Sequence, residues 1–187
     1  MLSKTIKVKS MNTKAGSHQK MIYLTTTGLF AALICITTAY IFHIPVGTNG
    51  GYVHVGDALI YLAAAILPTP YAIAAAALGG AMADLMTAPV WTLATLIIKM
   101  LIAVPFTSKK DKIIHVQNII SVFIASLITI VGYYLAEVIL FGSWVAIIPS
   151  ITGSIVQAIG SGILFLAFGH ALDKMRFKTM LKNKFHI

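Results

Sequence analysis

Long apolar segments alternate along this chain with short basic ones, and this alternation limits what the chain can fold into. Of its 14 Lys and Arg residues, all but one lie in three clusters outside the apolar segments. Only Lys99 stands within such a segment. With 58% hydrophobic and 10% charged residues, the chain is too apolar for an ordinary soluble domain, in which about a quarter of residues are charged. The sequence therefore predicts an integral membrane protein.

Six apolar segments predict an all-α fold, a bundle of six transmembrane helices over residues 21–172. They cover residues 21–42, 57–67, 71–85, 90–106, 113–140 and 144–172. About 20 apolar residues cross the hydrocarbon core of a bilayer, but the segment that begins at Asp57 is only about half that long and ends before Pro68. We expect either the preceding loop to fold into the bundle or this helix to be tilted against its neighbours. The third segment is rich in Ala and Gly, which favours close helix contact.

The basic clusters predict how the chain lies in the membrane. Lys and Arg residues gather before the first apolar segment, after the fourth and after the last, and are missing from the other connections. Since basic residues are enriched in cytoplasmic segments, we expect both termini in the cytoplasm, with basic cytoplasmic tails at residues 1–20 and 173–187. No cleavable signal peptide is expected, because the first apolar segment follows a polar tail and lacks a small-residue cleavage site.

Several common kinds of site are not predicted. The net charge of +9 does not indicate nucleic-acid binding, because the cations flank apolar segments and do not form one recognition surface. Cys35 is the only cysteine, so no intrachain disulfide can form. The histidines lack a metal-ligand spacing, and no Gly-x-x-x-x-Gly-Lys-Ser/Thr loop occurs. We therefore expect no metal, no cofactor and no ATP site in this chain, and any energy from ATP must come through a partner.

Three predicted helices carry polar or aromatic faces near their outer ends. On the fourth, three- and four-residue steps join Trp91, Thr92, Thr95 and Lys99. The fifth carries Tyr133, Tyr134 and Glu137, and the sixth carries Ser150, Ser154, Gln157 and Ser161. Ionisable groups at membrane depth cost about 2.5–3.5 kcal/mol each on insertion scales and usually face a cavity or one another. A polar chamber inside the bundle is therefore indicated by Asp57, Asp84, Lys99 and Glu137.

A structural interpretation of the same residues is also open. Lys99 could pair with Asp84 or Glu137 and so neutralise itself, while the Ser and Gln side chains hydrogen-bond to neighbouring helices. Trp91 falls at a predicted boundary, where tryptophan also anchors helices at the membrane surface. These roles need no ligand.

Two other segments allow two interpretations each. In the glycine-rich loop at 43–56, Tyr52 and His54 either cover a ligand or only pack against the bundle. On the first helix, Gly28 and Ala32 have the small-xxx-small spacing that lets another helix approach closely, and Ala31 extends this face. The approaching helix belongs either to this protein or to a separate membrane subunit.

Three stretches of the sequence resemble those of a known family. They are Gly51-Tyr-Val-His-Val-Gly-Asp57-Ala-Leu-Ile-Tyr-Leu-Ala-Ala, Leu78-Gly-Gly-Ala-Met-Ala-Asp84-Leu and Thr95-Leu-Ile-Ile-Lys99. Together with the size and the six predicted spans, they resemble the substrate-binding S components of energy-coupling factor (ECF) vitamin transporters. Within that group the chain is most similar to the hydroxymethylpyrimidine or pyridoxine type, and more distantly to riboflavin and pantothenate members.

The resemblance implies a function, partners and a site. An S component captures a vitamin outside the cell, here a bacterial cell, and docks on a transmembrane T component with two cytoplasmic ATPases, which drive release to the inside. Family members meet the T component through small residues of the first helix, which correspond here to Gly28, Ala31 and Ala32. Family ligands sit near the outer face, between the first loop and the fourth to sixth helices. We therefore expect ligand contacts from Asn49, Tyr52, His54, Asp84, Trp91, Thr95, Lys99, Tyr133, Glu137 and Gln157.

Ligand identity and two other functional classes stay open at this point. A flat pyridine or pyrimidine with hydroxyls suits a site in which Trp91 or Tyr133 stacks on the ring, whereas an unpaired Lys99 would favour the carboxylate of pantothenate. A self-sufficient transporter or channel is disfavoured because no internal repeat is visible. A membrane enzyme with Asp84 or Glu137 as general base is disfavoured because no nucleophile–base arrangement is recognisable. We expect a transport subunit and not an enzyme.

Overall fold

The computed structural model describes residues 2–41, 44–46, 51–53, 55–142 and 147–185, with side chains for residues 17–41, 55–142 and 153–184. Its elements are α1 (Leu2–Ala39), β1 (Ile44–Val46), β2 (Gly51–Val53), α2 (Val55–Ile66), α3 (Thr69–Thr87), the short 3₁₀ helix η1 (Pro89–Trp91), α4 (Thr92–Ala103), α5 (Val116–Phe141), α6 (Ile147–Lys174) and α7 (Phe177–Phe185). Each predicted apolar segment overlaps one of the helices α1 to α6. The predicted helical bundle is therefore confirmed.

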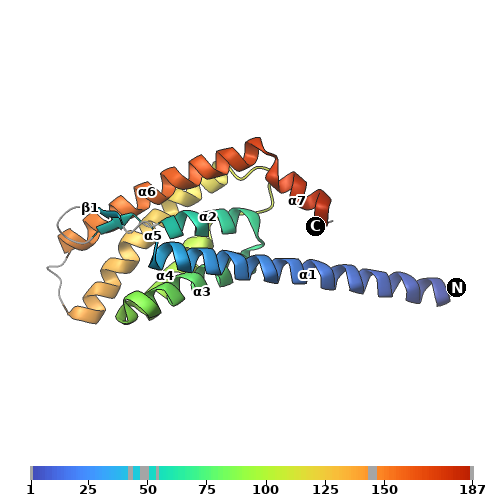
Figure 1. The fold of residues 1–187 in the computed structure, drawn as a ribbon, viewed down its shortest axis with the longest axis horizontal. Coiled ribbons are helices and arrows are strands. Elements are labelled where there is room, and N and C mark those ends of the chain that lie inside the picture. Colours follow the sequence, from blue (N-terminus) through green and yellow to red (C-terminus); the bar gives the residue numbers. More distant parts are fainter. Residues whose placement is uncertain (1, 42–43, 47–50, 54, 143–146, 186–187) are drawn as a thin grey trace.

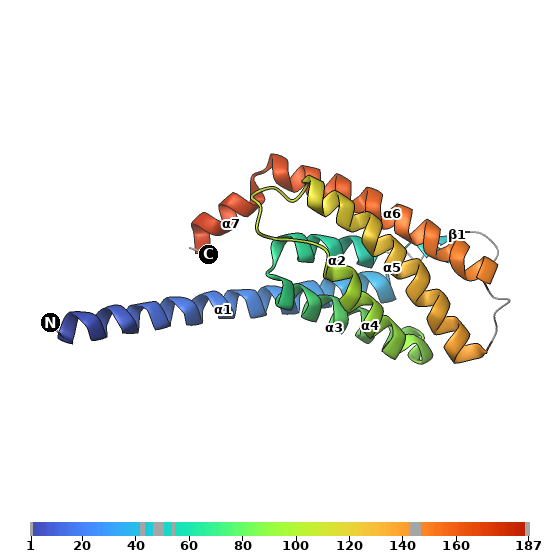
Figure 2. The same cartoon turned by 180° about the vertical axis from the view of Figure 1, so that it is seen from behind.

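The helices run back and forth along the long axis of the molecule (Figure 1). Both termini lie at one end, together with α7 and the connection between α4 and α5, and the first part of α1 extends beyond the bundle there (Figure 1; Figure 2). We call this the basic end, since all three basic clusters lie toward it. The opposite end carries the β1–β2 hairpin, and we call it the hairpin end. The fold thus places all three clusters on one side of the bundle, as a membrane protein with a positive inner face requires.

Apolar side chains cover the outside of the bundle. Phe123, Leu127 and Ile139 on α5 are 72%, 63% and 81% exposed, and similar residues follow α1 and α6. Exposed apolar surface of this extent marks a membrane interface. Three described stretches are long and apolar enough to cross a bilayer, namely Ser17–Ala39, Val116–Phe141 and Gly153–Lys174. Length, composition and surface together indicate a multi-pass membrane protein.

The short helix α2 lies in the centre of the bundle. It packs against α1, α3, α4 and α6, and nine of its residues are buried, from Gly56 to Ala65. The structure thus shows this half-length segment packed against neighbouring helices, while most of the loop before it lies outside the described residues. The position of α2 matters for function, because its first turn brings Asp57 into the middle of the bundle.

Two adjacent glycines let α3 approach two helices at once. A Cβ on Gly79 would lie 2.7 Å from Ile34 Cβ on α1, and a Cβ on Gly80 would lie 2.7 Å from Lys99 Cγ on α4. Both distances are too short for real atoms, so only glycine permits these contacts. The Ala- and Gly-rich composition of this segment predicted such close packing, and the structure confirms it.

Several boundaries differ from the prediction. The predicted basic tail at residues 1–20 continues into the first helix, since α1 begins at Leu2. The loop at 43–56 contains an antiparallel hairpin in which Pro45 pairs with Tyr52. The predicted tail at 173–187 contains α7.

The connection between α4 and α5 is held by side chains rather than by helix. The Asn118 side chain bonds both the N–H and the carbonyl oxygen of Thr107 and the carbonyl oxygen of Ile113. The Asp173 carboxylate accepts hydrogen bonds from the backbone N–H groups of Ile113 (2.7 Å) and Ile114 (2.8 Å). These bonds satisfy the backbone outside helical geometry, which explains why α5 begins at Val116 and not at the predicted Ile113.

Candidate ligand-binding site

Lys99 forms a buried ion pair in the centre of the bundle. Its Nζ lies 2.6 Å from Asp57 Oδ1, and the two residues are 4% and 2% exposed. The partner is therefore Asp57, and the two sequence candidates Asp84 and Glu137 were wrong for this role. The reason is the central position of α2, which places its first turn beside the inner face of α4.

Gln157 shares the same carboxylate. Its Nε2 donates a hydrogen bond to Asp57 Oδ2 at 2.6 Å, and it is 8% exposed on α6. Each Asp57 oxygen thus accepts a hydrogen bond from a different helix, one from α4 and one from α6. A single buried side chain on α2 joins three helices.

A second set of contacts lies one turn of α4 nearer the hairpin end. Thr95 Oγ1 donates a short hydrogen bond to Asp84 Oδ2 on α3, and it lies 3.1 Å from the Tyr133 hydroxyl on α5. Since the single Thr95 proton goes to Asp84, Tyr133 is the donor in the second contact. The Tyr133 ring also lies 5.3 Å from Lys99 Nζ, within cation–π range. These contacts connect Thr95 to the ion pair.

We call Asp57, Asp84, Thr95, Lys99, Tyr133 and Gln157 the polar cluster. Trp91 borders it, with its ring 6.1 Å from that of Tyr133 in an edge-on arrangement and 5.7 Å from that of Phe141. Five of the six cluster residues, and Trp91, were predicted as ligand contacts. Asp57 was predicted as an acid at membrane depth but was not placed among the ligand contacts.

The remaining predicted ligand contacts are less well defined. Glu137 is partly exposed on α5, four residues after Tyr133, and Lys99 is not bonded to it. Tyr52 lies in β2, and its side chain is outside the described residues, as are Asn49 and His54. The strand β2 itself packs against α6. The hairpin therefore sits next to the helix that supplies Gln157.

The predicted partner-contact residues on α1 divide between two faces. Gly28 and Ala32 are exposed on the outside of the bundle, and a Cβ on Gly28 would meet nothing within 4 Å. Ala31 is 8% exposed, and its carbonyl oxygen faces Gly79 of α3. Gly28 and Ala32 are thus free to meet another helix, whereas Ala31 packs within this protein.

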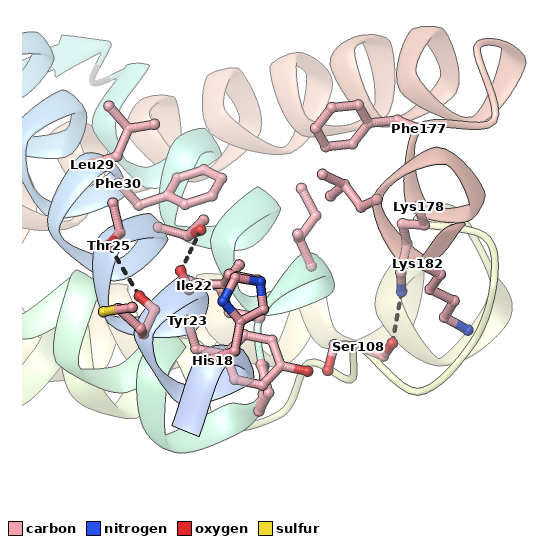
Figure 3. A pocket seen from close by; sticks show the side chains of 16 residues that line it. His18, Ile22, Tyr23, Thr25, Leu29, Phe30, Ser108, Phe177, Lys178 and Lys182 are labelled. Atoms are coloured by element: carbon pink, nitrogen blue, oxygen red, sulfur yellow. Dashed lines mark hydrogen bonds between the residues drawn. The ribbon is translucent and has the colours of Figure 1, made fainter. Parts of the chain in front are cut away.

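A separate cavity of about 520 Å³ lies at the basic end, between α1, the α2–α3 turn and α7 (Figure 3). The Thr25 and Thr26 hydroxyls donate to carbonyl oxygens of their own helix, so this wall of the cavity is largely apolar. Lys178 lines the cavity but turns its ammonium to Ser108, as the dashed line in Figure 3 shows. None of the polar cluster lines this cavity, so it is distinct from the candidate ligand site.

Comparison with known families identifies the chain. The family model for the S component of ECF-type riboflavin transporters matches residues 18–174. The chain belongs to this family. A search of curated proteins found no match. The predicted resemblance to ECF S components is thereby confirmed, while the hydroxymethylpyrimidine or pyridoxine type is not. Membership implies a substrate-binding transport subunit that works with a T component and ATPases.

Proposed function

We propose that this S component captures a small, flat, water-soluble vitamin near the hairpin end of the bundle. The observation that carries the proposal is the polar cluster, a connected set of hydrogen-bonding groups in the interior of a largely apolar bundle. It includes the ring of Tyr133 and is bordered by the ring of Trp91. Ligand sites combine aromatic surface with a few placed polar groups in this way. An apolar bundle without a ligand would not need so costly a set.

We assign the residue roles from the sequence expectations and from the contacts of the polar cluster. Trp91 or Tyr133 stacks on the ring, and Asp84 with Glu137 hydrogen-bonds its substituents. Tyr52, His54 and Asn49, whose side chains lie outside the described residues, are assigned to cover the ligand, as the sequence predicts. Lys99 and Gln157 support the site from its inner side through Asp57.

The choice among vitamins starts from the family and from Lys99. Riboflavin is the first ligand to test, because the matching family model carries its name. Hydroxymethylpyrimidine and pyridoxine have the same flat, hydroxylated, uncharged character and come next. Pantothenate is disfavoured, since the cation that would bind its carboxylate is already paired with Asp57.

Delivery of the vitamin uses partners. The exposed Gly28 and Ala32 on α1 meet the T component, and the two ATPases supply the energy. In this proposal residues 21–172 form the substrate-binding unit. The two basic tails lie in the cytoplasm and face the ATPases.

The test is ligand binding by the purified chain without its partners. Protein emptied of ligand is screened by native mass spectrometry and thermal shift against riboflavin, hydroxymethylpyrimidine, pyridoxine and pantothenate. We expect one tight, stabilising ligand that Tyr133→Phe weakens, while the matched Tyr134→Phe on the same helix leaves its affinity unchanged. No hit in well-folded protein would contradict vitamin capture. Flux of a solute into liposomes that contain this chain alone would favour a self-sufficient transporter.

A further inference from the structure

Asp57 has the strongest set of buried contacts in the candidate site. Its carboxylate is 2% exposed and accepts a hydrogen bond from Lys99 Nζ and one from Gln157 Nε2, both at 2.6 Å. Asp57 also stands in the first turn of α2, where a negative charge is stabilised by the helix dipole. These contacts fix the direction of both donors.

Asp57 also controls the charge of the site. The polar cluster contains one cation, Lys99, and two acids, Asp57 and Asp84. With Asp57 in place the charge of Lys99 is cancelled at a distance of 2.6 Å, so no free positive charge faces a ligand. Replacing Asp57 by a neutral residue would raise the net charge of the site by one unit, in a region of low dielectric constant where charge interactions are strong.

We propose that Asp57 is a specificity-determining positioning residue, which holds Lys99 and Gln157 in place and makes the site select uncharged vitamins over their anionic derivatives. The inference rests on the proposed function. A purely structural role of Asp57, in which it only ties α2 to α4 and α6, is the alternative. The two differ in one respect, because a structural role does not distinguish a ligand from its anionic form.

The experiment uses matched ligand pairs that differ in charge. Riboflavin is compared with its phosphate ester flavin mononucleotide, hydroxymethylpyrimidine with its phosphate ester, and pyridoxine with 4-pyridoxate. For each pair, the dissociation constant of the anionic member divided by that of the uncharged member is measured in wild-type protein and in Asp57→Asn. Any steric cost of the added group cancels when this ratio is compared between variants.

We expect Asp57→Asn to lower the ratio at least about tenfold, since a change of one charge near the ligand is worth of the order of 1.4 kcal/mol or more. The double variant Asp57→Asn with Lys99→Met should return the ratio toward that of wild type, because neither charge of the pair remains. Gln157→Leu should leave the ratio unchanged, because this substitution removes a hydrogen bond but no charge. An equal loss of affinity for both members in Asp57→Asn would overturn the inference.

A second comparison keeps the test valid if Asp57→Asn does not fold. Lys99→Met and the double variant differ only at position 57, and the ratio should be higher in Lys99→Met because Asp57 is then uncompensated. Equal ratios in these two variants would overturn the inference. If wild-type protein binds neither member of any pair, the proposed function itself is wrong and the inference falls with it.

Discussion

Among the side chains that the structure describes, two lysines are buried, one in the centre of the bundle and one at its basic end, and they are stabilised in different ways. Lys99 is 4% exposed and is paired with the carboxylate of Asp57. Lys178 on α7 is 5% exposed, and its described hydrogen bonds all go to backbone carbonyl oxygens, those of Ala65 (2.9 Å), Ser108 (2.7 Å) and Lys110. The first arrangement cancels the charge, whereas the second only solvates it.

The difference matches the two surroundings. In the centre of an apolar bundle an uncompensated charge would be very costly, and Lys99 is therefore paired directly with a carboxylate. At the basic end, Lys178 instead meets the C-terminal turn of α2, whose free carbonyl oxygens and negative dipole end attract a cation. Its bonds also fasten α7 to the α4–α5 connection. One lysine therefore sets the charge of a site, and the other holds an end of the fold together.

The largest effect on stability is expected when one member of the Lys99–Asp57 ion pair is replaced. Lys99→Met leaves the Asp57 carboxylate buried without its cation, and such a break costs about 3–5 kcal/mol. Adding Asp57→Asn should restore much of the stability lost in Lys99→Met, since neither charge of the pair then remains. The free energy of unfolding of both variants is measured in detergent, by heat or by denaturant. A Lys99→Met protein as stable as wild type would show that the pair contributes little.

A smaller, local effect is expected at the other lysine. Lys178→Met removes the donor for three carbonyl oxygens. One hydrogen bond with a charged partner contributes about 1.5–3 kcal/mol, and because removing the buried ammonium also removes its desolvation cost, we expect a net loss of about this size. Hydrogen exchange should speed up in α7 and in residues 104–115 but not in α4. Lys182→Met is the matched control, because Lys182 pairs with Asp111 in solvent, where ion pairs contribute little. An equal rise in hydrogen exchange in both variants would contradict a special role for Lys178.

Lys99 can also be disturbed without changing any charge. Gly80→Ala places a methyl group 2.7 Å from Lys99 Cγ. Overpacking of this kind costs about 1–3 kcal/mol, and the better helix propensity of alanine offsets up to about 1 kcal/mol of it. We therefore expect a net loss of about 1–2 kcal/mol in unfolding experiments. Gly28→Ala is the control, since nothing lies within 4 Å of its Cβ, and it should be no less stable than wild type.

The sequence predicted the elements of this fold better than the contacts between them. Apolar length located α1 to α6, and the four-residue step from Thr95 to Lys99 placed both side chains on the buried face of α4. The pairing of Lys99 with Asp57, 42 residues away, depends on α2 lying at the centre of the bundle, which no periodicity reveals. Short-range patterns fix which face is polar, and only the packing fixes which partner meets it.

Lys178 shows the same limit at the basic end. In the sequence it is one of five cations in a polar tail, and nothing distinguishes it from Lys174 or Lys182. Its burial depends on three carbonyl oxygens from α2 and from residues 104–115, which come together only in the folded chain. The hairpin is similar, because Gly-rich sequence predicted a break in the helix but not the pairing of Ile44 with Val53.

The smallest expected effect is a pH dependence that separates the two ways of burying a lysine. Burial lowers the pKa of Lys178 from its usual 10.5 to about 8, the neighbouring charge of Lys182 acts in the same direction, and Asp111 and Asp173 oppose it. Between these two pH values the unfolded chain binds more protons than the folded one, so stability rises with pH. From pH 7 to 8.5 wild type should gain up to about 1 kcal/mol relative to Lys178→Met, in which this group does not titrate. Unfolding of both proteins over that range isolates Lys178 from other titrating groups. The opposite slope would mean that the three carbonyl oxygens favour the cation more than burial disfavours it, and Lys178 would then resemble Lys99 in being held charged.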